Sequence, residues 1–131
     1  MKNRYAWLDA CLLEKPGAEK DYKAEWGWFR YRVGEKMFAA ICEPGQEHGQ
    51  YAGHMLLTVK CEPTLGELLR AQCPNAVKPG FYMDKRCWNS VFLDEALPEE
   101  MLRGMCDTSY RLVFERLTKK LQREILSAAE K

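Results

Sequence analysis

The segment WFRYRVGEKMFAAIC, residues 28–42, constrains the fold of this chain more than any other stretch. Its aromatic or aliphatic residues at 29, 31 and 33 alternate with residues 28, 30 and 32, which is the two-residue period of a β-strand. A Gly-Glu pair follows and suits a two-residue turn with glycine first. With that turn, Tyr31 faces Phe38 and Phe29 faces Ala40. We therefore expect a β-hairpin with one face in the core.

The other face of this hairpin is expected to mix apolar and cationic side chains. Strand alternation places six residues on it: Trp28, Arg30, Arg32, Met37, Ala39 and Ile41. A contiguous apolar surface on such a face is typical of a partner-binding site, whereas its cations suit an anionic ligand.

The remaining sequence supplies elements that can cover the hairpin. A helix is predicted over residues 4–14, and strands are predicted at residues 54–60 and 87–93. Between these strands a short helix is expected, because Thr64 and Glu67 have the spacing of a capping box.

The C-terminal part of the chain predicts helices. Pro98 suits a first helical position, and the two glutamates behind it favour a helix start. A break is expected near Asp107 or Thr108, either of which would cap a second helix, and an apolar stripe at helical spacing covers residues 110–121. The order of elements predicts an α+β fold, in which an antiparallel β-sheet is flanked by an N-terminal helix and C-terminal helices.

Length and charge limit the organisation of the chain and the kind of partner. The 131 residues suit one domain, spanning residues 1–131. Lysine and arginine together number 20 and aspartate and glutamate 19, so the formal net charge is +1. A nucleic acid would therefore have to meet a local basic patch, because the molecule has no general positive field.

The cysteines and the N-terminal sequence indicate a reducing compartment. The six cysteines are far apart with no C-x-x-C pair, and no apolar run resembles a signal peptide or is long enough to cross a bilayer. We expect a cytoplasmic protein with free thiols, no metal, no cofactor and no membrane contact, as a monomer or weak dimer.

Residue patterns of catalysis are scarce. His48 and His54 have no partner at a recognisable spacing, and no phosphate-binding glycine motif or nucleophile elbow occurs. The expectation is a protein without enzymatic activity. One alternative stays open: Cys87 follows Lys85 and Arg86, and neighbouring cations lower the pKa of a thiol.

Three groups of basic residues could bind an anionic ligand. In the first, Trp26 and Trp28 share one side of the strand with Arg30 and Arg32, and rings interleaved with guanidinium groups suit base stacking and phosphate pairing. The alternative is that the tryptophans pack under the first helix and the arginines are solvated. Lys36 would add a cation at the end of the same hairpin.

The second group is Lys85 and Arg86 with Trp88 and Asn89. Strand alternation puts Arg86 on the side of Trp88 and Lys85 on the side of Asn89, so the two cations share a surface only if the strand twists or bulges. The alternative is a solvated lysine beside a core tryptophan. The third group, over residues 116–123, is the polar face of an amphipathic helix.

Several of these pieces, in this order and at these separations, resemble a known family. WLDACLLEKPGAEKDYK, GEKMFAAI, KRCWNSVFLD, a Leu-Pro pair and DTSYRLV are together similar to the MmcQ/YjbR proteins, which are small bacterial cytosolic proteins of unknown function. The resemblance covers roughly residues 5–121. Two departures are visible: Cys87 stands where the family commonly has histidine, and the connection Glu43–Gly53 is longer than usual.

The resemblance implies an α-β-α domain like the frataxin homologue CyaY, an arrangement also seen in type III secretion chaperones. It also implies a double-wing DNA-binding role. The hairpin cations Arg30, Arg32 and Lys36, with Lys85 and Arg86, would then contact phosphates without reading sequence. Two functions follow as hypotheses. The first is DNA binding without catalysis, and the second is a chaperone-like module that binds a protein or peptide on the mixed face of the hairpin.

Overall fold

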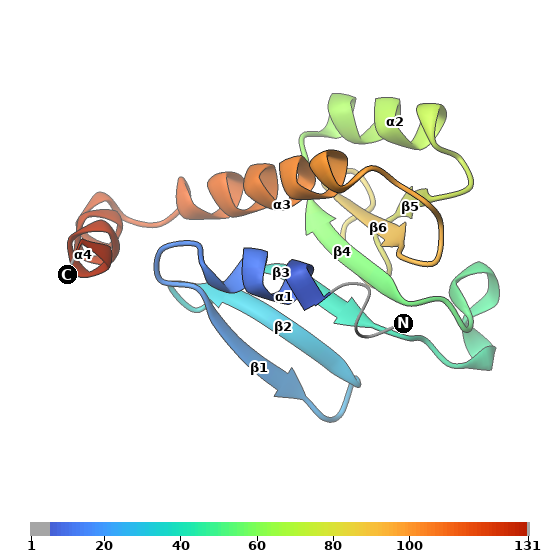
Figure 1. Cartoon of the computed structure of the whole chain (residues 1–131), viewed down its shortest axis with the longest axis horizontal. Helices are drawn as coiled ribbons and strands as arrows, with labels where there is room; N and C mark the ends of the chain where they lie inside the picture. The colour runs from blue at the N-terminus through green and yellow to red at the C-terminus, as the bar shows by residue number, and fades with distance from the viewer. Residues whose placement is uncertain (1–5, 131) are drawn as a thin grey trace.

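A single antiparallel sheet organises the computed structural model, which describes residues 6–130 (Figure 1). Its six strands have the order β1-β2-β3-β4-β6-β5. They are β1 (Glu19–Lys23), β2 (Trp28–Val33), β3 (Lys36–Cys42), β4 (Leu56–Lys60), β5 (Val77–Pro79) and β6 (Trp88–Phe92). The hairpin predicted from the sequence is β2 and β3, which pair with β1 on one side and β4 on the other.

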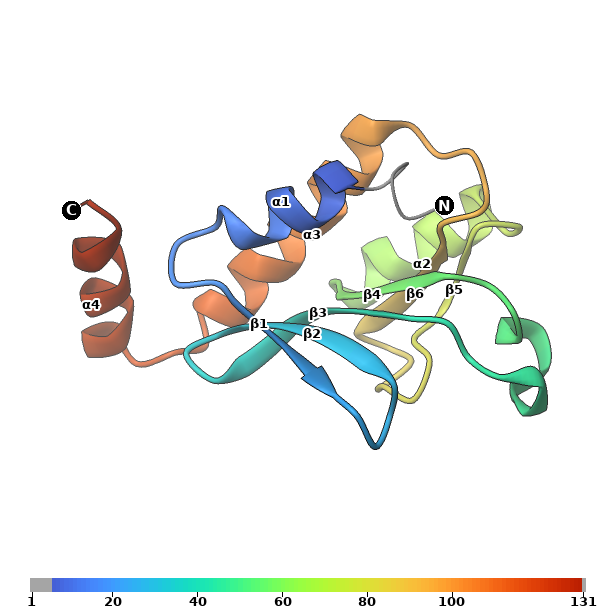
Figure 2. The ribbon, with the colours of Figure 1, turned by 60° about the horizontal axis from the view of Figure 1, so that its bottom comes forward.

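Within the described residues, four α-helices accompany the sheet: α1 (Ala6–Leu13), α2 (Pro63–Gln72), α3 (Glu99–Phe114) and α4 (Lys119–Ala129). Helices α1, α2 and α3 lie on the same side of the sheet, whereas α4 lies beyond the end of α3 (Figure 2). A short 3-10 segment, η2 (Gln46–Tyr51), follows β3. The α+β fold with flanking N- and C-terminal helices is therefore confirmed. The start predicted for the first helix, at Arg4, lies outside the described residues.

The hairpin carries a β-bulge that the alternating pattern did not predict. Tyr31 pairs with Ala39 and Arg32 with Met37, so the register passes over Phe38. The predicted pairs Tyr31–Phe38 and Phe29–Ala40 are wrong by one residue for this reason. A bulge shifts the faces of every residue beyond it.

The bulge places three hairpin residues differently from the prediction. Ala39 and Ile41 belong to the core on the helical side of the sheet instead of to the mixed face, while Ala40 lies in the opposite cluster. Phe29 keeps its predicted face but is 44% exposed, because it lies near the edge strand β1.

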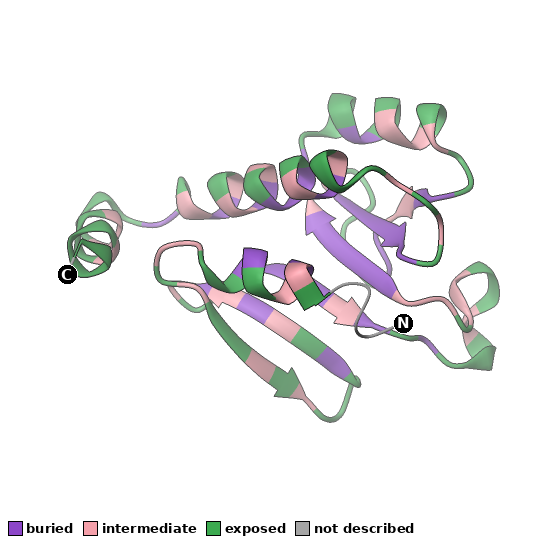
Figure 3. Ribbon diagram, viewed as in Figure 1, coloured by how far each residue is buried: buried purple, intermediate pink, exposed green. Residues whose placement is uncertain are grey.

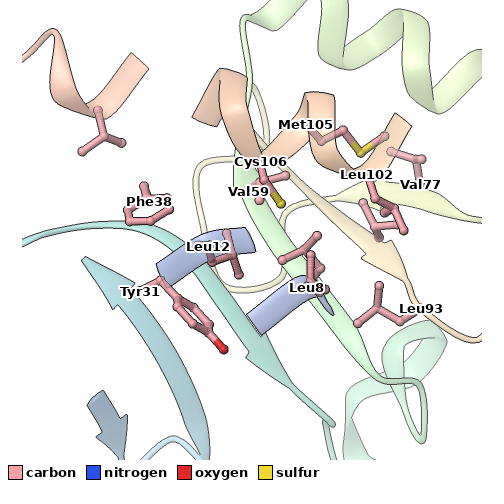
Figure 4. Packing of buried hydrophobic residues seen from close by; sticks show 14 of the residues in the cluster. Leu8, Leu12, Tyr31, Phe38, Val59, Val77, Leu93, Leu102, Met105 and Cys106 are labelled. Atoms are coloured by element: carbon pink, nitrogen blue, oxygen red, sulfur yellow. The ribbon is translucent and has the colours of Figure 1, made fainter. Parts of the chain in front are cut away.

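Burial is concentrated in the middle of the sheet. The larger core joins α1, α3 and the helical face of the sheet through residues such as Leu8, Leu12, Tyr31, Phe38 and Leu102 (Figure 4). A second cluster lies on the opposite face, where loops cover it instead of helices. β4 and β6 are buried along almost their whole length, whereas β1 and α4 are largely exposed (Figure 3).

Ser109 of α3 joins the helix to the bulged part of the sheet. Its hydroxyl donates to the carbonyl oxygen of Phe38 and accepts from the N–H of Lys60 at 2.8 Å, and the side chain is fully buried. The next residue, Tyr110, packs edge-on against the Phe38 ring and donates to the Pro16 carbonyl oxygen. Through Ser109 and Tyr110, the segment DTSYRLV connects α3 to the first loop and to the hairpin.

Two predicted helix boundaries are wrong. Helix α2 begins at Pro63 with Glu62 as N-cap and no side-chain capping bond, so Thr64 does not cap it. Helix α3 runs unbroken through Asp107 and Thr108, because the side chains of Leu102, Met105 and Cys106 keep one face of it in the core. The break comes later, where Thr118 caps α4 by accepting from the N–H of Leu121 at 3.1 Å.

Helix α4 contacts the rest of the molecule through few residues. None of its residues is buried, and Leu121 and Ile125 are only partly covered by the core. Gly34 in the hairpin turn permits this contact, because a side chain there would lie 2.9 Å from Leu117 and 3.1 Å from Leu121. In the part of the chain that the structure describes, no helix is long and apolar enough to cross a membrane.

Candidate functional site

The two predicted hairpin arginines are held by one carboxylate on the edge strand. Arg30 makes a double hydrogen bond with Asp21, at 2.9 and 2.6 Å, and Arg32 lies 3.3 Å from the same carboxylate. These hydrogen bonds from Arg30 lower the pKa of Asp21. Both guanidinium groups are largely covered, with side chains 20% and 30% exposed. They are therefore less available to phosphates than the sequence suggested.

Lys85 and Arg86 lie in a turn before β6 and not on a strand, so the alternation predicted for them does not apply. Lys85 donates to the Gly80 carbonyl oxygen at 2.6 Å, which closes the loop between β5 and β6. Arg86 is 83% exposed and pairs with Asp84 at 3.3 Å. Lys85 is therefore held within its own loop, whereas Arg86 lies at the surface.

The other two candidate residues of this segment, Trp88 and Asn89, are buried. Trp88 is buried at 8% exposure, and Asn89 at 2% accepts from Arg70 at 2.6 Å and donates to the Gly66 carbonyl oxygen at 3.3 Å. Asn89 therefore attaches α2 to the sheet. Lys36 is exposed at the hairpin turn.

Three of the predicted residues, Trp26, Trp28 and Arg30, do come together. They line a groove of about 760 Å³ on the face of the sheet opposite α1 and α3. Three separate segments form it: the β1–β2 turn with β2, β3 with the connection after it, and the loop after β5. We call it the aromatic groove; its apolar lining includes Trp26, Trp28, Met37, Phe81, Tyr82 and Met83. Of the mixed face predicted for partner binding, Trp28 and Met37 are here and Ile41 is not.

Aromatic rings form the floor and the rim of the groove. Trp28 and Phe81 are buried, at 6% exposure each, with ring centroids 6.3 Å apart. Trp26, 55% exposed, meets Trp28 edge-on at 5.4 Å. His48 meets Phe81 edge-on at 5.0 Å. A buried floor and an exposed rim are features of pockets that bury part of a ligand.

Tyr82 is the most exposed of these aromatic residues and has a strained backbone. Its φ is +57°, in the left-handed region that large side chains rarely adopt, and the side chain is 71% exposed. The loop imposes this conformation because the N–H groups of Gly80 and Phe81 are fixed to Trp88 O and Ser90 Oγ, at 2.8 and 2.9 Å. Strain of this kind is concentrated at functional sites.

Carboxylates outnumber cations around the groove. Glu25, Glu43 and Glu47 line it, and the single lysine or arginine among the lining residues is Arg30, which is bound to Asp21. Glu25 lies 3.5 Å from Lys23 and Glu47 lies 3.4 Å from His48. Glu43 is exposed and makes no ion pair within residues 6–130. The groove thus has an acidic character.

Sequence reasoning missed the two loops that complete the groove. The long connection Glu43–Gly53 supplies Glu43, Glu47 and His48, and the loop after β5 supplies Phe81 and Tyr82. The sequence held one signal for the second loop, the run Phe-Tyr-Met directly after Pro-Gly. Consecutive large apolar residues in a loop indicate that the loop packs against another part of the protein. Among residues 6–130, no cluster of side chains is suited to hold a metal ion.

The cysteines give a first prediction. Cys11, Cys42, Cys61 and Cys106 are buried, and burial raises the pKa of both Cys42 and Cys106 to about 12. Cys73 and Cys87 are half-buried. Iodoacetamide should therefore modify Cys73 and Cys87 in the native protein before the four buried thiols, as followed by peptide mass spectrometry.

Cys73 is the matched control for Cys87 in that experiment, because it has similar burial without Lys85 and Arg86 beside it. A rate at Cys87 far above that at Cys73 would favour the thiol-enzyme alternative. Equal rates would count against it. Rapid labelling of Cys42 or Cys106 would contradict the burial pattern.

The sheet, its helical layer and the groove on the opposite face define a small α+β domain of a kind solved before. The crystal structure of the Deinococcus radiodurans protein DR2400, which carries a DUF419 domain, is similar to it with a TM-score of 0.75 and 26% identity, over 90% of this chain and 84% of that one.

The sequence comparisons identify the family. The YjbR family profile matches residues 13–112, so the chain belongs to the YjbR (MmcQ/YjbR) family. The uncharacterised protein YjbR of Escherichia coli K12 is 31% identical over 79% of this chain and 80% of its own length. The uncharacterised Bacillus subtilis protein YyaQ is 28% identical over 77% of this chain and 90% of its own.

Proposed function

We propose that this chain is a binding module without catalytic activity, and that it holds an apolar peptide segment of a protein partner in the aromatic groove. The observation that carries the proposal is the composition of the groove. Exposed Trp26 and Tyr82 stand over the buried rings of Trp28 and Phe81, and Met37 and Met83 lie beside them. Aromatic and methionine side chains are enriched at protein interfaces, and methionine adapts to varied partners.

The size of the groove suits several side chains and not a folded surface. Its volume of about 760 Å³ is within the range of pockets for compact ligands. A peptide that buries two or three apolar side chains there would gain about 25 cal/mol for each Å² removed from water. Part of this gain is offset by the ordering of the peptide.

DNA binding stays a prediction, and the ion pairs argue against it. Arg30 and Arg32 share Asp21, Arg86 pairs with Asp84, and Lys85 is engaged by a carbonyl oxygen of its own loop. A phosphate would have to compete with these partners. The glutamates around the groove would also repel a nucleic-acid strand placed over its tryptophans.

The test is selection of binding peptides from a displayed library of random sequences on the full chain. Enriched peptides are expected to bind the wild type and to lose about tenfold or more in affinity for the Trp26→Ala/Tyr82→Asn variant, measured by calorimetry. Asparagine is chosen at position 82 because it tolerates the left-handed backbone found there.

Tyr22→Ala is the matched control. Tyr22 is 54% exposed on β1 and packs against Phe29, outside the groove lining. Peptides that bind the groove should bind this variant as they bind the wild type. Failure to enrich any peptide, or equal loss in both variants, would overturn the proposal. Labelled duplex and single-stranded DNA at low salt complete the test, and tight salt-dependent binding there would favour the DNA hypothesis.

A further inference from the structure

We propose that the peptide held in the aromatic groove carries a basic side chain, arginine ahead of lysine, next to its apolar residues. This inference rests on the proposed function and specifies its ligand. The basic group would lie on the ring of Tyr82 and face the carboxylates of Glu43 and Glu47. The apolar residues of the peptide would cover Trp28 and Met37.

The first reason is the charge of the groove. Three glutamates line it, and Glu25 is paired with Lys23 while Arg30 and Arg32 share Asp21, so the carboxylates of Glu43 and Glu47 are the ones without a lysine or arginine partner within residues 6–130. Glu43 has no ion-pair partner within residues 6–130, so an incoming cation would provide one. Charge complementarity of this kind selects among peptides of equal hydrophobicity.

The second reason is that the two exposed rings, Trp26 and Tyr82, differ in their contacts with cations. Trp26 already has the cations of Lys23 and Arg30 at 5.3 and 5.7 Å from its ring centroid. No lysine or arginine of residues 6–130 lies over the ring of Tyr82, which is 71% exposed. The Tyr82 ring meets Phe81 and His48 edge-on, at 4.7 and 5.6 Å between centroids, and its exposed part is accessible to a ligand cation.

The third reason is the anchored backbone of the loop that presents Tyr82. Its neighbour Phe81 is fixed by a hydrogen bond to Ser90 and by packing in the groove floor, and the left-handed backbone leaves Tyr82 directed outward. A ring held in place loses little entropy when a ligand stacks on it. Arginine is expected ahead of lysine because its planar guanidinium stacks on aromatic faces.

The experiment compares each selected peptide with a version in which citrulline replaces arginine. Citrulline keeps the planar shape and removes the charge. We expect about fivefold to tenfold weaker binding of the citrulline peptide to the wild type. The Glu43→Gln/Glu47→Gln variant should bind the arginine peptide more weakly than the wild type does, and should distinguish the two peptides less.

Two further variants act as controls. Glu67→Gln removes an exposed carboxylate on α2, outside the groove lining, and should leave both affinities unchanged. Tyr82→Phe keeps the ring and should retain the preference for arginine, whereas Tyr82→Asn should reduce it.

The outcomes separate this inference from the proposed function. Peptides that need Trp26 but contain no basic residue, or that bind equally well with citrulline, overturn the basic-ligand inference and leave the groove as a peptide site. If no selected peptide depends on Trp26 and Tyr82, the proposed function fails and the inference fails with it.

Discussion

Replacing Ser109 with alanine is expected to lower the free energy of unfolding by about 2–4 kcal/mol. The hydroxyl of Ser109 bonds two backbone groups, the carbonyl of Phe38 at the hairpin bulge and the N–H of Lys60 at the end of β4. Without it, two backbone groups at a fully buried position lose their partner, and each unpaired group costs about 1–3 kcal/mol. Urea denaturation followed by circular dichroism measures the loss.

Ser109→Val should be at least as unstable, because it removes the same bonds and adds two methyl groups at a site with no exposed surface. Ser127→Ala is the matched control on exposed α4, and its stability should change by less than about 0.5 kcal/mol. A Ser109→Ala protein as stable as the Ser127→Ala protein would contradict the assigned role of the hydroxyl.

Replacing Gly80 with alanine is expected to destabilise the chain by about 2–3 kcal/mol and to weaken peptide binding. A methyl group at this position would lie 2.6 Å from Cβ of Trp88 and 3.0 Å from its carbonyl oxygen. Because backbone atoms cannot move aside as a flexible side chain can, the loop itself must shift. That loop carries Phe81 and Tyr82 into the aromatic groove, so stability and binding should fall together.

Gly104→Ala tests whether the effect is specific to position 80. Gly104 is inside α3, and a methyl group there meets no atom within 4 Å. This variant should gain about 0.5–1 kcal/mol from the higher helix propensity of alanine, with unchanged peptide affinity. A Gly80→Ala protein with wild-type stability and binding would show that the loop tolerates the shift.

The elements of the fold could be predicted from local patterns, but the faces of the hairpin could not. Alternation correctly placed a strand at residues 28–33 and a two-residue turn after it. The turn has φ of +54° at Gly34 and +67° at Glu35, whereas a turn with glycine first requires a positive φ at glycine alone. The carbonyl of Phe38 at the bulge accepts a hydrogen bond from Ser109, 71 residues later in the sequence, and no local pattern contains that partner.

Separation along the sequence also explains which residues of the site could be predicted and which could not. Trp26, Trp28 and Arg30 could be grouped because they share one side of a strand. Their neighbours Glu47 and Tyr82 come from loops that only the folded sheet brings near. Asp21 could have been suspected, since it lies on a strand that pairs with β2 directly opposite Arg30. Trp88 and Asn89 were candidates by residue type, and the structure buries both of them away from the groove.

The exposure of α4 has a consequence for how the molecule unfolds. A helix with no buried residue contributes little to cooperativity, whereas β4 and β6 cannot be exposed without loss of the whole core. Local stability therefore decreases toward the C-terminus. The last helix, residues 119–129, can therefore unfold locally while the sheet and its groove remain folded.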